Sequence, residues 1–334
     1  MSCKGSSCRC RVKVVDGGFA TQLSQHVDEP VDGNPLWSAR FLATHPEAIV
    51  QTHLDFLRAG ANIIITNTYQ ASVDGFMKYL GLSENESIEL IEMAVKLAKK
   101  AVDTFMSEQN GLAERPLIAG SVGPYGASLH DYSEYSGDYA DRVTRRQLAE
   151  WHRPRIAALL RAGADLLAVE TIPAQAEAEA VADLLRDFPA ARAWIAFSCK
   201  DGERISHGER FCEAARSCWE RNPRQLLAVG VNCLKPRFVA PLVASLNEGR
   251  DACPIPVVAY PNSGENFDTQ LGAWVDVDNC KPVETYVRDW LSLGVRYVGG
   301  CCRTTDQDVS RIRAEVKKWQ AGRAATGTAA NGHA

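Results

Sequence analysis

Two adjacent cysteines, Cys301 and Cys302, are the residues whose type and spacing most directly suggest chemistry. They follow two glycines and a short apolar run at 295–298, and Thr304 and Gln307 have the spacing of a helix capping box. A strand, a Gly-Gly exit and a helix start would place both sulfurs on a loop at the carboxyl end of a strand. Neighbouring cysteines are poorly placed for a disulfide, but they could face one metal ion. Burial of both in the core as small apolar residues is the alternative.

Length and composition restrict the class of protein. The chain has 334 residues, of which 46% are hydrophobic and 23% charged, which suits two ordinary domains or one large barrel. A net charge of −4 without a basic block argues against nucleic acid as a partner. No apolar run approaches the ~18–20 residues of a membrane span. The first residues contain no apolar secretion signal, so the eleven cysteines are expected to be reduced thiols in a cytoplasmic enzyme.

A repeated sequence segment indicates the fold. Residues 161–171 nearly repeat residues 58–68, and residues 293–301 are a looser third copy. Each copy combines a helix stop, a glycine and a buried apolar strand. Strands are expected to begin near residues 12, 61, 117, 165, 193, 226, 255 and 295, each followed by a helix.

Eight β/α units in a row predict a single (β/α)8 TIM barrel over residues 12–320, its last helix covering 306–320. A flexible tail is expected at 1–11 and a disordered tail at 321–334. An open doubly wound sheet is the alternative, but no G-x-G-x-x-G motif follows any predicted strand.

A third cysteine belongs to the same end of the predicted barrel, where barrel enzymes carry their chemistry. Cys233 ends the sixth strand, and strands six and eight end roughly 9–10 Å apart across one neighbour. Three thiolates without an evident fourth ligand are typical of zinc with one open position, at sulfur–metal distances of ~2.3 Å. Such an electron-rich site suits a substrate thiol better than water, so alkyl transfer to sulfur is the expected chemistry.

Several motifs at these strand ends resemble the homocysteine S-methyltransferase family, and most closely its plant-type members that use S-methylmethionine. The likeness runs from about Val12 to Trp319. It implies a zinc-dependent barrel that makes methionine from homocysteine, with one Zn²⁺ per chain bound by Cys233, Cys301 and Cys302. The motifs that carry it are Val14–Leu23, Asn34–Ser38, Glu134–Gly137, Glu170–Pro173, Gly230–Cys233, Tyr260–Glu265 and Gly299–Thr305.

The resemblance also suggests how homocysteine is bound. Asp16, Gly17 and Glu170 resemble the family's homocysteine contacts, and both carboxylates could pair with the substrate's amino group. Glu170 ends a buried apolar strand, where an unpaired charge would be costly. Asn232 and Ser263 are expected to orient ligands or to donate to the cysteine sulfurs, with ordinary loop capping as the alternative.

A sulfonium donor is a cation, and aromatic faces attract cations. Trp37, Tyr69, Tyr125 and Tyr135 are therefore the expected donor-binding residues, and packing of these rings against the barrel is the alternative.

The expected reaction is attack of the homocysteine thiolate, bound to zinc, on the methyl group of S-methylmethionine, with S-adenosylmethionine as a further donor. The leaving thioether is neutral, so no separate general acid or base is expected. A selenocysteine Se-methyltransferase would share these motifs, a betaine-using relative is a further alternative, and a non-catalytic zinc-binding barrel is the rival from another class. The sequence does not fix the oligomeric state; a monomer is the default.

Overall fold

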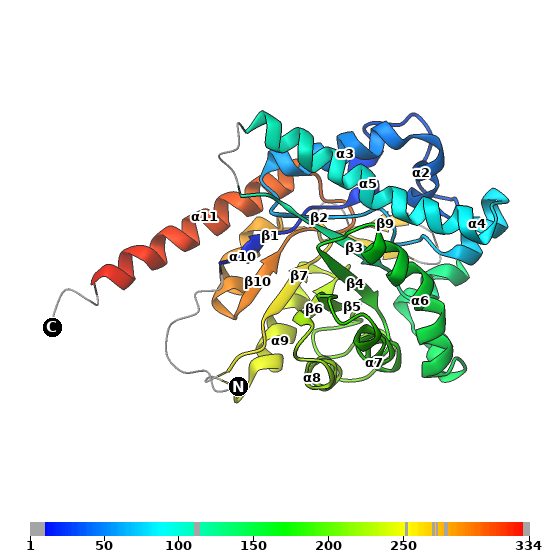
Figure 1. Cartoon of the computed structure of the whole chain (residues 1–334). Coiled ribbons are helices and arrows are strands. Elements are labelled where there is room, and N and C mark those ends of the chain that lie inside the picture. Colours follow the sequence, from blue (N-terminus) through cyan, green and yellow to red (C-terminus); the bar gives the residue numbers. More distant parts are fainter. Residues whose placement is uncertain are drawn as a thin grey trace.

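A closed parallel barrel forms the centre of the molecule (Figure 1). The computed structural model describes residues 11–109, 114–250, 253–268, 271, 273–276 and 280–329. Its large sheet has the strand order β1-β10-β7-β6-β5-β4-β3-β2. A parallel bridge between Val15 and Ile63 then joins β1 to β2. The strands are β1 (Lys13–Val14), β2 (Ile63–Ile65), β3 (Leu117–Val122), β4 (Leu166–Ile172), β5 (Ala193–Phe197), β6 (Leu226–Asn232), β7 (Val257–Tyr260) and β10 (Val295–Val298). The predicted (β/α)8 barrel is confirmed.

Helices between successive strands cover the outside of the barrel (Figure 1). The longer ones are α3 (Pro46–Ala59), α4 (Val73–Leu80), α5 (Glu84–Glu108), α6 (Arg145–Arg161), α7 (Gln175–Leu184), α8 (Phe211–Arg221), α9 (Pro236–Asn247), α10 (Glu284–Ser292) and α11 (Asp306–Ala329). Shorter helices lie in the connections: α1 (Phe19–Leu23), η1 (Trp37–Arg40), α2 (Phe41–Thr44), η2 (Tyr125–Leu129), η3 (Ser133–Tyr135), η4 (Asp138–Asp141) and η5 (Leu185–Asp187). None of the described helices is both long enough and apolar enough to span a bilayer.

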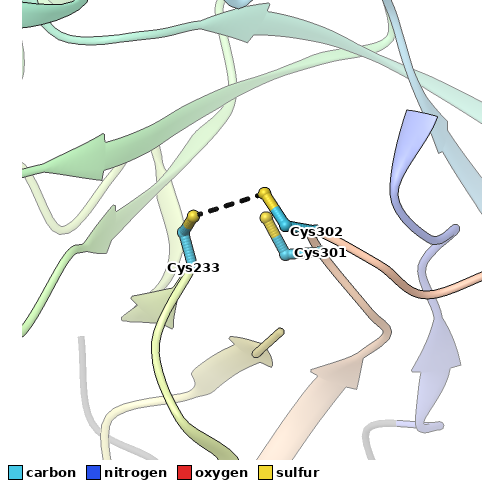
Figure 2. A group of neighbouring side chains, drawn as sticks. All are labelled: Cys233, Cys301 and Cys302. Carbon is cyan, nitrogen blue, oxygen red and sulfur yellow. Dashed lines mark hydrogen bonds between the residues drawn. The ribbon is translucent and has the colours of Figure 1, made fainter. Parts of the chain in front are cut away.

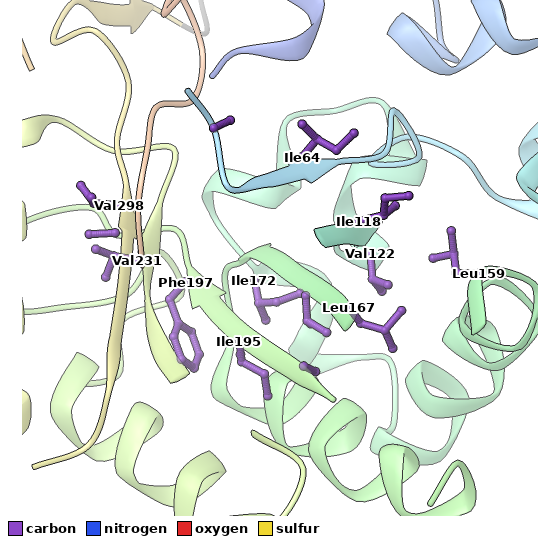
Figure 3. Packing of buried hydrophobic residues seen from close by; sticks show 14 of the residues in the cluster. Ile64, Ile118, Val122, Leu159, Leu167, Ile172, Ile195, Phe197, Val231 and Val298 are labelled. Atoms are coloured by element: carbon purple, nitrogen blue, oxygen red, sulfur yellow. The ribbon is translucent and has the colours of Figure 1, made fainter. Parts of the chain in front are cut away.

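Two apolar layers pack on opposite faces of the strands, because successive strand residues point in opposite directions. Ile64 and Ile118 belong to the outer layer between sheet and helices (Figure 3). Ile63, Trp194 and Tyr260 belong to a smaller cluster inside the barrel. Trp194 Nε1 donates to Tyr260 Oη at 3.0 Å. These large rings fill the barrel interior, which is therefore a packed core rather than a channel.

The start of the last helix differs from its prediction. The expected capping box of Thr304 and Gln307 does not form, because α11 begins at Asp306 and the Thr305 N–H donates to Asp308 Oδ2 at 2.8 Å. The Thr304 hydroxyl instead donates to the carbonyl oxygen of Cys301 at 2.7 Å. Thr304 therefore shapes the cysteine loop and does not cap the helix.

The predicted chain ends also differ from the structure where they can be compared. α11 continues beyond Gln320 to Ala329, so residues 321–329 are helical where the sequence predicted disorder. Alanine, the residue with the highest helix propensity, occupies positions 321, 324, 325 and 329, whereas the glycines at 322 and 327 have a low one. The remaining tail residues, 1–10 and 330–334, lie outside the described part of the chain.

A short antiparallel hairpin follows β7 and was not predicted. Its strands are β8 (Asn266–Asp268) and β9 (Ala273–Val275). It brings Trp274 to the same end of the barrel as the cysteine loops.

Candidate functional site

A cavity of about 750 Å³ opens at the carboxyl ends of the strands. All the predicted site residues except Tyr125 and Ser263 contribute to its wall. Its wall includes Asp16, Gly17, Trp37, Tyr69, Tyr132, Glu134, Tyr135, Glu170, Thr171, Asn232, Cys233, Tyr260, Trp274, Cys301, Cys302 and Arg303. The position is the one at which (β/α)8 enzymes carry their active sites.

The three cysteines converge in this cavity from two loops (Figure 2). Cys233 follows β6, while Cys301 and Cys302 follow β10. The three sulfurs lie within 4.8 Å of one another, and Cys233 Sγ is 3.7 Å from Cys302 Sγ. Ligands at ~2.3 Å from a tetrahedral zinc ion are roughly 3.8 Å apart. The spacing and the soft sulfur donors therefore fit zinc.

The loop after β7 fixes the cysteine backbone. Cys301 N–H donates to Pro261 O at 2.8 Å, and Ser263 N–H donates to Cys302 O at 3.1 Å. Cys233 N–H donates to Tyr260 O at 3.2 Å. In the sheet, β7 lies between β6 and β10, the strands that precede the cysteines. The loop after β7 therefore holds both cysteine loops in place.

Polar groups around Cys233 favour its thiolate. Tyr135 Oη lies 3.2 Å from Cys233 Sγ. Hydrogen bonds from Cys301 and Cys302, followed by those from Tyr135 and Asn262, lower the pKa of the Cys233 thiol well below its ordinary range. A sulfur with this many donors carries negative charge readily, which is what a cation requires of its ligands.

Two buried carboxylates, Asp16 and Glu170, line the same cavity. Asp16 Oδ2 accepts from the Ile65 N–H at 2.7 Å. Glu170 accepts hydrogen bonds from the hydroxyls of Ser121 and Tyr260. Burial raises the pKa of Glu170 to about 7 and that of Asp16 well above its ordinary range. An ammonium group placed between them would stabilise the charged forms of both.

Two of the predicted homocysteine contacts have other partners. Asn232 lines the cavity, but its Oδ1 accepts from Thr171 N–H at 2.7 Å and its Nδ2 donates to Thr171 Oγ1 at 2.8 Å. Asn232 thus fixes Thr171, which has a φ of +59°. The Ser263 hydroxyl bonds to Glu265 and lies outside the cavity wall. Ser263 therefore holds the cysteine loop through its backbone N–H, which donates to Cys302 O.

Three of the four predicted donor-binding rings line the cavity. The rings of Trp37 and Tyr69 are 6.0 Å apart with an edge-on geometry, and Tyr135 is close to Cys233. Tyr125 was expected to join them but packs elsewhere, against Tyr139 and Trp151, with ring centroids 5.4 and 5.2 Å away.

Backbone strain is concentrated around this cavity. Trp37, Thr171, Cys233 and Arg303 have φ values of 45°, 59°, 54° and 61°, in the left-handed region that non-glycine residues rarely adopt. Such conformations cost on the order of 1–3 kcal/mol each and persist where the surrounding contacts impose them. Their concentration here supports a functional role for the cavity.

Sequence reasoning missed several residues that complete the site. Ser121 and Tyr260 bond to Glu170, and Asn262 bonds to Cys233. Each is a polar residue at or just after the end of a predicted strand, a signal that was visible. Trp274 gave no such signal, because it belongs to the unpredicted hairpin.

The fold and the site together define a (β/α)8 protein with a cysteine-rich centre and an acidic, aromatic cavity. Residues 13–316 match the family model described as "Homocysteine S-methyltransferase". The chain belongs to this family and is a homocysteine S-methyltransferase, as the motifs predicted.

Relatives in three organisms agree with this assignment. The chain is 49% identical over 308 residues to "Betaine-homocysteine S-methyltransferase" of Drosophila melanogaster, covering 90% of this chain and 92% of the relative. It is 41% identical over 304 residues to "Homocysteine S-methyltransferase" of Escherichia coli, covering 91% and 94%. It is 41% identical over 319 residues to "Homocysteine S-methyltransferase 3" of Arabidopsis thaliana, covering 90% and 88%.

Solved structures of a relative have the same fold. The metallated form of the homocysteine methyltransferase MmuM from Escherichia coli superposes with a TM-score of 0.80 at 39% identity, covering 91% of this chain and 96% of that one. The apo form of MmuM superposes with a TM-score of 0.71 at 34% identity and the same coverage.

Proposed function

We propose that this enzyme transfers a methyl group from S-methylmethionine to the thiolate of L-homocysteine, with zinc bound by Cys233, Cys301 and Cys302. The observation that carries the proposal is the meeting of three sulfurs, four carboxylates and several aromatic rings in one cavity. Each group suits one part of a reaction between a thiolate and a sulfonium.

The sulfur cluster supports the metal part of the proposal. Its spacing fits a tetrahedral ion, and Tyr135 and Asn262 donate to the Cys233 sulfur as outer partners of a metal ligand commonly do. When bound, zinc would lower the pKa of a substrate thiol and keep it as a nucleophilic thiolate.

The carboxylates of Asp16 and Glu170 support recognition of the amino acid acceptor. Both are buried in the wall of the cavity that holds the sulfurs. An ammonium group would satisfy their charge, and this pairing would orient the amino acid in the cavity.

The acidic and aromatic lining of the cavity supports a cationic donor. Asp16, Asp32, Glu134 and Glu170 line it, whereas Arg303 is the only lysine or arginine among the described residues of the wall. The faces of Trp37, Tyr69 and Tyr135 would add cation–π attraction for a sulfonium.

The reaction balances without a protein acid or base. The thiolate sulfur forms a new bond to the methyl carbon, the carbon–sulfur bond of the sulfonium breaks, and its electron pair stays on the leaving thioether. The opposite charges of the reactants disappear as the reaction proceeds. The walls of the cavity would favour it by excluding water and by orienting both reactants.

Betaine is the second candidate donor. The Drosophila relative, 49% identical to this chain, is named for it. Betaine is also a methylated cation, a quaternary ammonium, so the same acidic and aromatic cavity could attract it.

A donor panel tests the proposal. The purified enzyme would be assayed with homocysteine and, in turn, S-methylmethionine, S-adenosylmethionine and betaine, with and without a zinc chelator, and with selenocysteine as an alternative acceptor. We expect methionine formation fastest with S-methylmethionine and homocysteine, lost with chelator and recovered on adding Zn²⁺. Faster turnover with betaine would overturn the donor assignment, and full activity after verified removal of the metal would overturn zinc dependence.

A further inference from the structure

A buried hydrogen-bond network of three side chains, His152, Arg155 and Glu177, lies outside the cavity wall, between α6 and α7. His152 Nδ1 accepts from Arg155 Nη2 at 3.0 Å, and His152 Nε2 lies 2.8 Å from Glu177 Oε1. All three side chains are buried, and none of them lines the cavity. Because arginine can only donate, His152 Nδ1 must accept and its Nε2 carries the proton that bonds Glu177. The neutral His152 ring thus connects the buried guanidinium of Arg155 to the buried carboxylate of Glu177.

Arg155, at one end of this network, holds the loops that follow two strands beside the cavity. Arg155 donates to the carbonyl oxygen of Ala71 at 3.0 Å, to that of Tyr69 at 3.3 Å and to that of Gly123. Tyr69 and Gly123 are also in close contact, since a Cβ atom on Gly123 would lie 2.4 Å from Tyr69 O. One side chain therefore fixes the loop after β2 to the loop after β3.

The carboxylate end holds the loop after β3. Glu177 Oε1 accepts from the Tyr125 N–H at 2.7 Å, and Glu177 Oε2 accepts from the Tyr139 hydroxyl. These two contacts lie on either side of η3, which carries Glu134 and Tyr135. A Cβ atom on Gly126 would lie 2.7 Å from Glu134 N, so the held segment packs directly on η3.

We propose that His152, Arg155 and Glu177 are positioning residues that set Tyr69 and Tyr135 for the methyl donor. The inference rests on the proposed role of these two rings in donor binding. Asp16, which follows β1, and Glu170, which lies within β4, are proposed for homocysteine. Their hydrogen bonds come from Ile65, Ser121 and Tyr260, which are not part of this network, and the network reaches Glu170 through the charge of Arg155. We therefore expect the network to affect the donor more than homocysteine.

The decisive variant is His152→Leu, which removes both hydrogen bonds while filling a similar volume. We expect the KM of the methyl donor to rise about tenfold, equivalent to about 1.4 kcal/mol, with the KM of homocysteine within twofold of wild type. His152→Gln, whose amide can accept from Arg155 and donate to Glu177, should recover most of the loss. The kinetics use whichever donor the wild-type enzyme turns over fastest, so that failure of the S-methylmethionine assignment does not affect the result.

Glu179→Gln is the matched control. Glu179 lies on the same helix as Glu177 and is equally buried, but its partners are Gln175, Ser217, Arg145 and Arg221. It should lower stability without changing the KM of the donor. Tyr139→Phe, which removes one hydrogen bond to Glu177, decides the question if His152→Leu does not fold, and should raise the donor KM several-fold.

Equal increases in both KM values, or a donor KM as sensitive to Glu179→Gln as to the network variants, would overturn the inference. So would unchanged kinetics in a folded His152→Leu or Tyr139→Phe variant.

Discussion

Gly18 packs directly on Cys301: a Cβ atom on Gly18 would lie 2.4 Å from the carbonyl oxygen of Cys301. The Gly18 N–H lies 3.0 Å from both the carbonyl oxygen and the hydroxyl of Thr304. The loop after the first strand and the cysteine loop after the last strand are thus bonded to each other. This contact places Asp16 and Gly17 beside the sulfurs.

Gly18→Ala should disturb the sulfur cluster through sterics alone. The φ of Gly18 is −68°, a value that alanine adopts freely, so only the contact with Cys301 resists the new methyl group. We expect a loss of about 1–3 kcal/mol in the free energy of unfolding, together with weaker zinc binding. Denaturant unfolding and competitive zinc titration measure the two effects.

Gly322→Ala is the control for this variant, because its added Cβ would have no neighbour within 4 Å on α11. It should be neutral or slightly stabilising. Wild-type zinc affinity in Gly18→Ala would show that the contact does not constrain the cluster.

Cys302→Ser should abolish stoichiometric zinc binding and methyl transfer. It removes one of three sulfurs within 4.8 Å of one another and replaces it by a poor zinc ligand. Metal content by mass spectrometry and turnover with homocysteine are the readouts. Cys212→Ser, a half-buried cysteine on α8, should keep both. A Cys302→Ser protein with full zinc content and activity would contradict the assignment.

The barrel was predictable because local signals and topology agree. Gly60, Gly163 and Gly294 adopt left-handed backbone conformations at helix ends, and each is followed by a buried strand. The repeated sequence segment predicts this arrangement. Once eight such units are counted, parallel strand ends must gather at one edge. The meeting of Cys233 with Cys301 and Cys302 then follows from the order of strands.

The details of the cavity were not predictable from residue types. Tyr125 and Tyr135 are both tyrosines of one loop, yet 3₁₀ turns direct the first against Trp151 and the second toward Cys233. Thr304 has the spacing of a cap, but the nearby Cys301 carbonyl competes for its hydroxyl. Such choices depend on contacts between distant parts of the chain, which no local pattern contains.

Trp37→Ala should weaken binding of the methyl donor more than that of homocysteine. Trp37 lies on η1, forms an edge-on pair with Tyr69 and donates from Nε1 to Asp32 at 2.7 Å. Loss of a cation–π contact of about 0.5–2 kcal/mol should raise the donor KM roughly twofold to thirtyfold. Initial rates with both substrates varied separate the two KM values, and Trp37→Phe should be intermediate. Equal effects on both substrates would argue against the cation–π role.

Glu170→Gln should raise the KM of homocysteine about 30-fold or more, because loss of a buried charge pair costs about 2–5 kcal/mol. Glutamine retains the volume and can still bond to Ser121 and Tyr260, so the fold should persist. The KM of the methyl donor should change much less. A wild-type homocysteine KM in the variant would exclude an ionic contact with the amino group.

The same variant should change how stability depends on pH. Burial raises the pKa of Glu170 from its ordinary 4.5 to about 7, so between these values the folded protein binds more protons at this site than the unfolded chain. The stabilisation by this protonated carboxyl is therefore complete below pH 4.5 and is lost as the pH rises through about 7. Relative to Glu170→Gln, the free energy of unfolding of the wild type should fall between about pH 4.5 and pH 7, by on the order of 1.4 kcal/mol per unit of pKa shift. Denaturant unfolding of both proteins across this range measures the difference, and homocysteine should diminish it in the wild type because its ammonium favours the carboxylate. Parallel pH profiles of the two proteins would show that Glu170 remains charged in the folded enzyme.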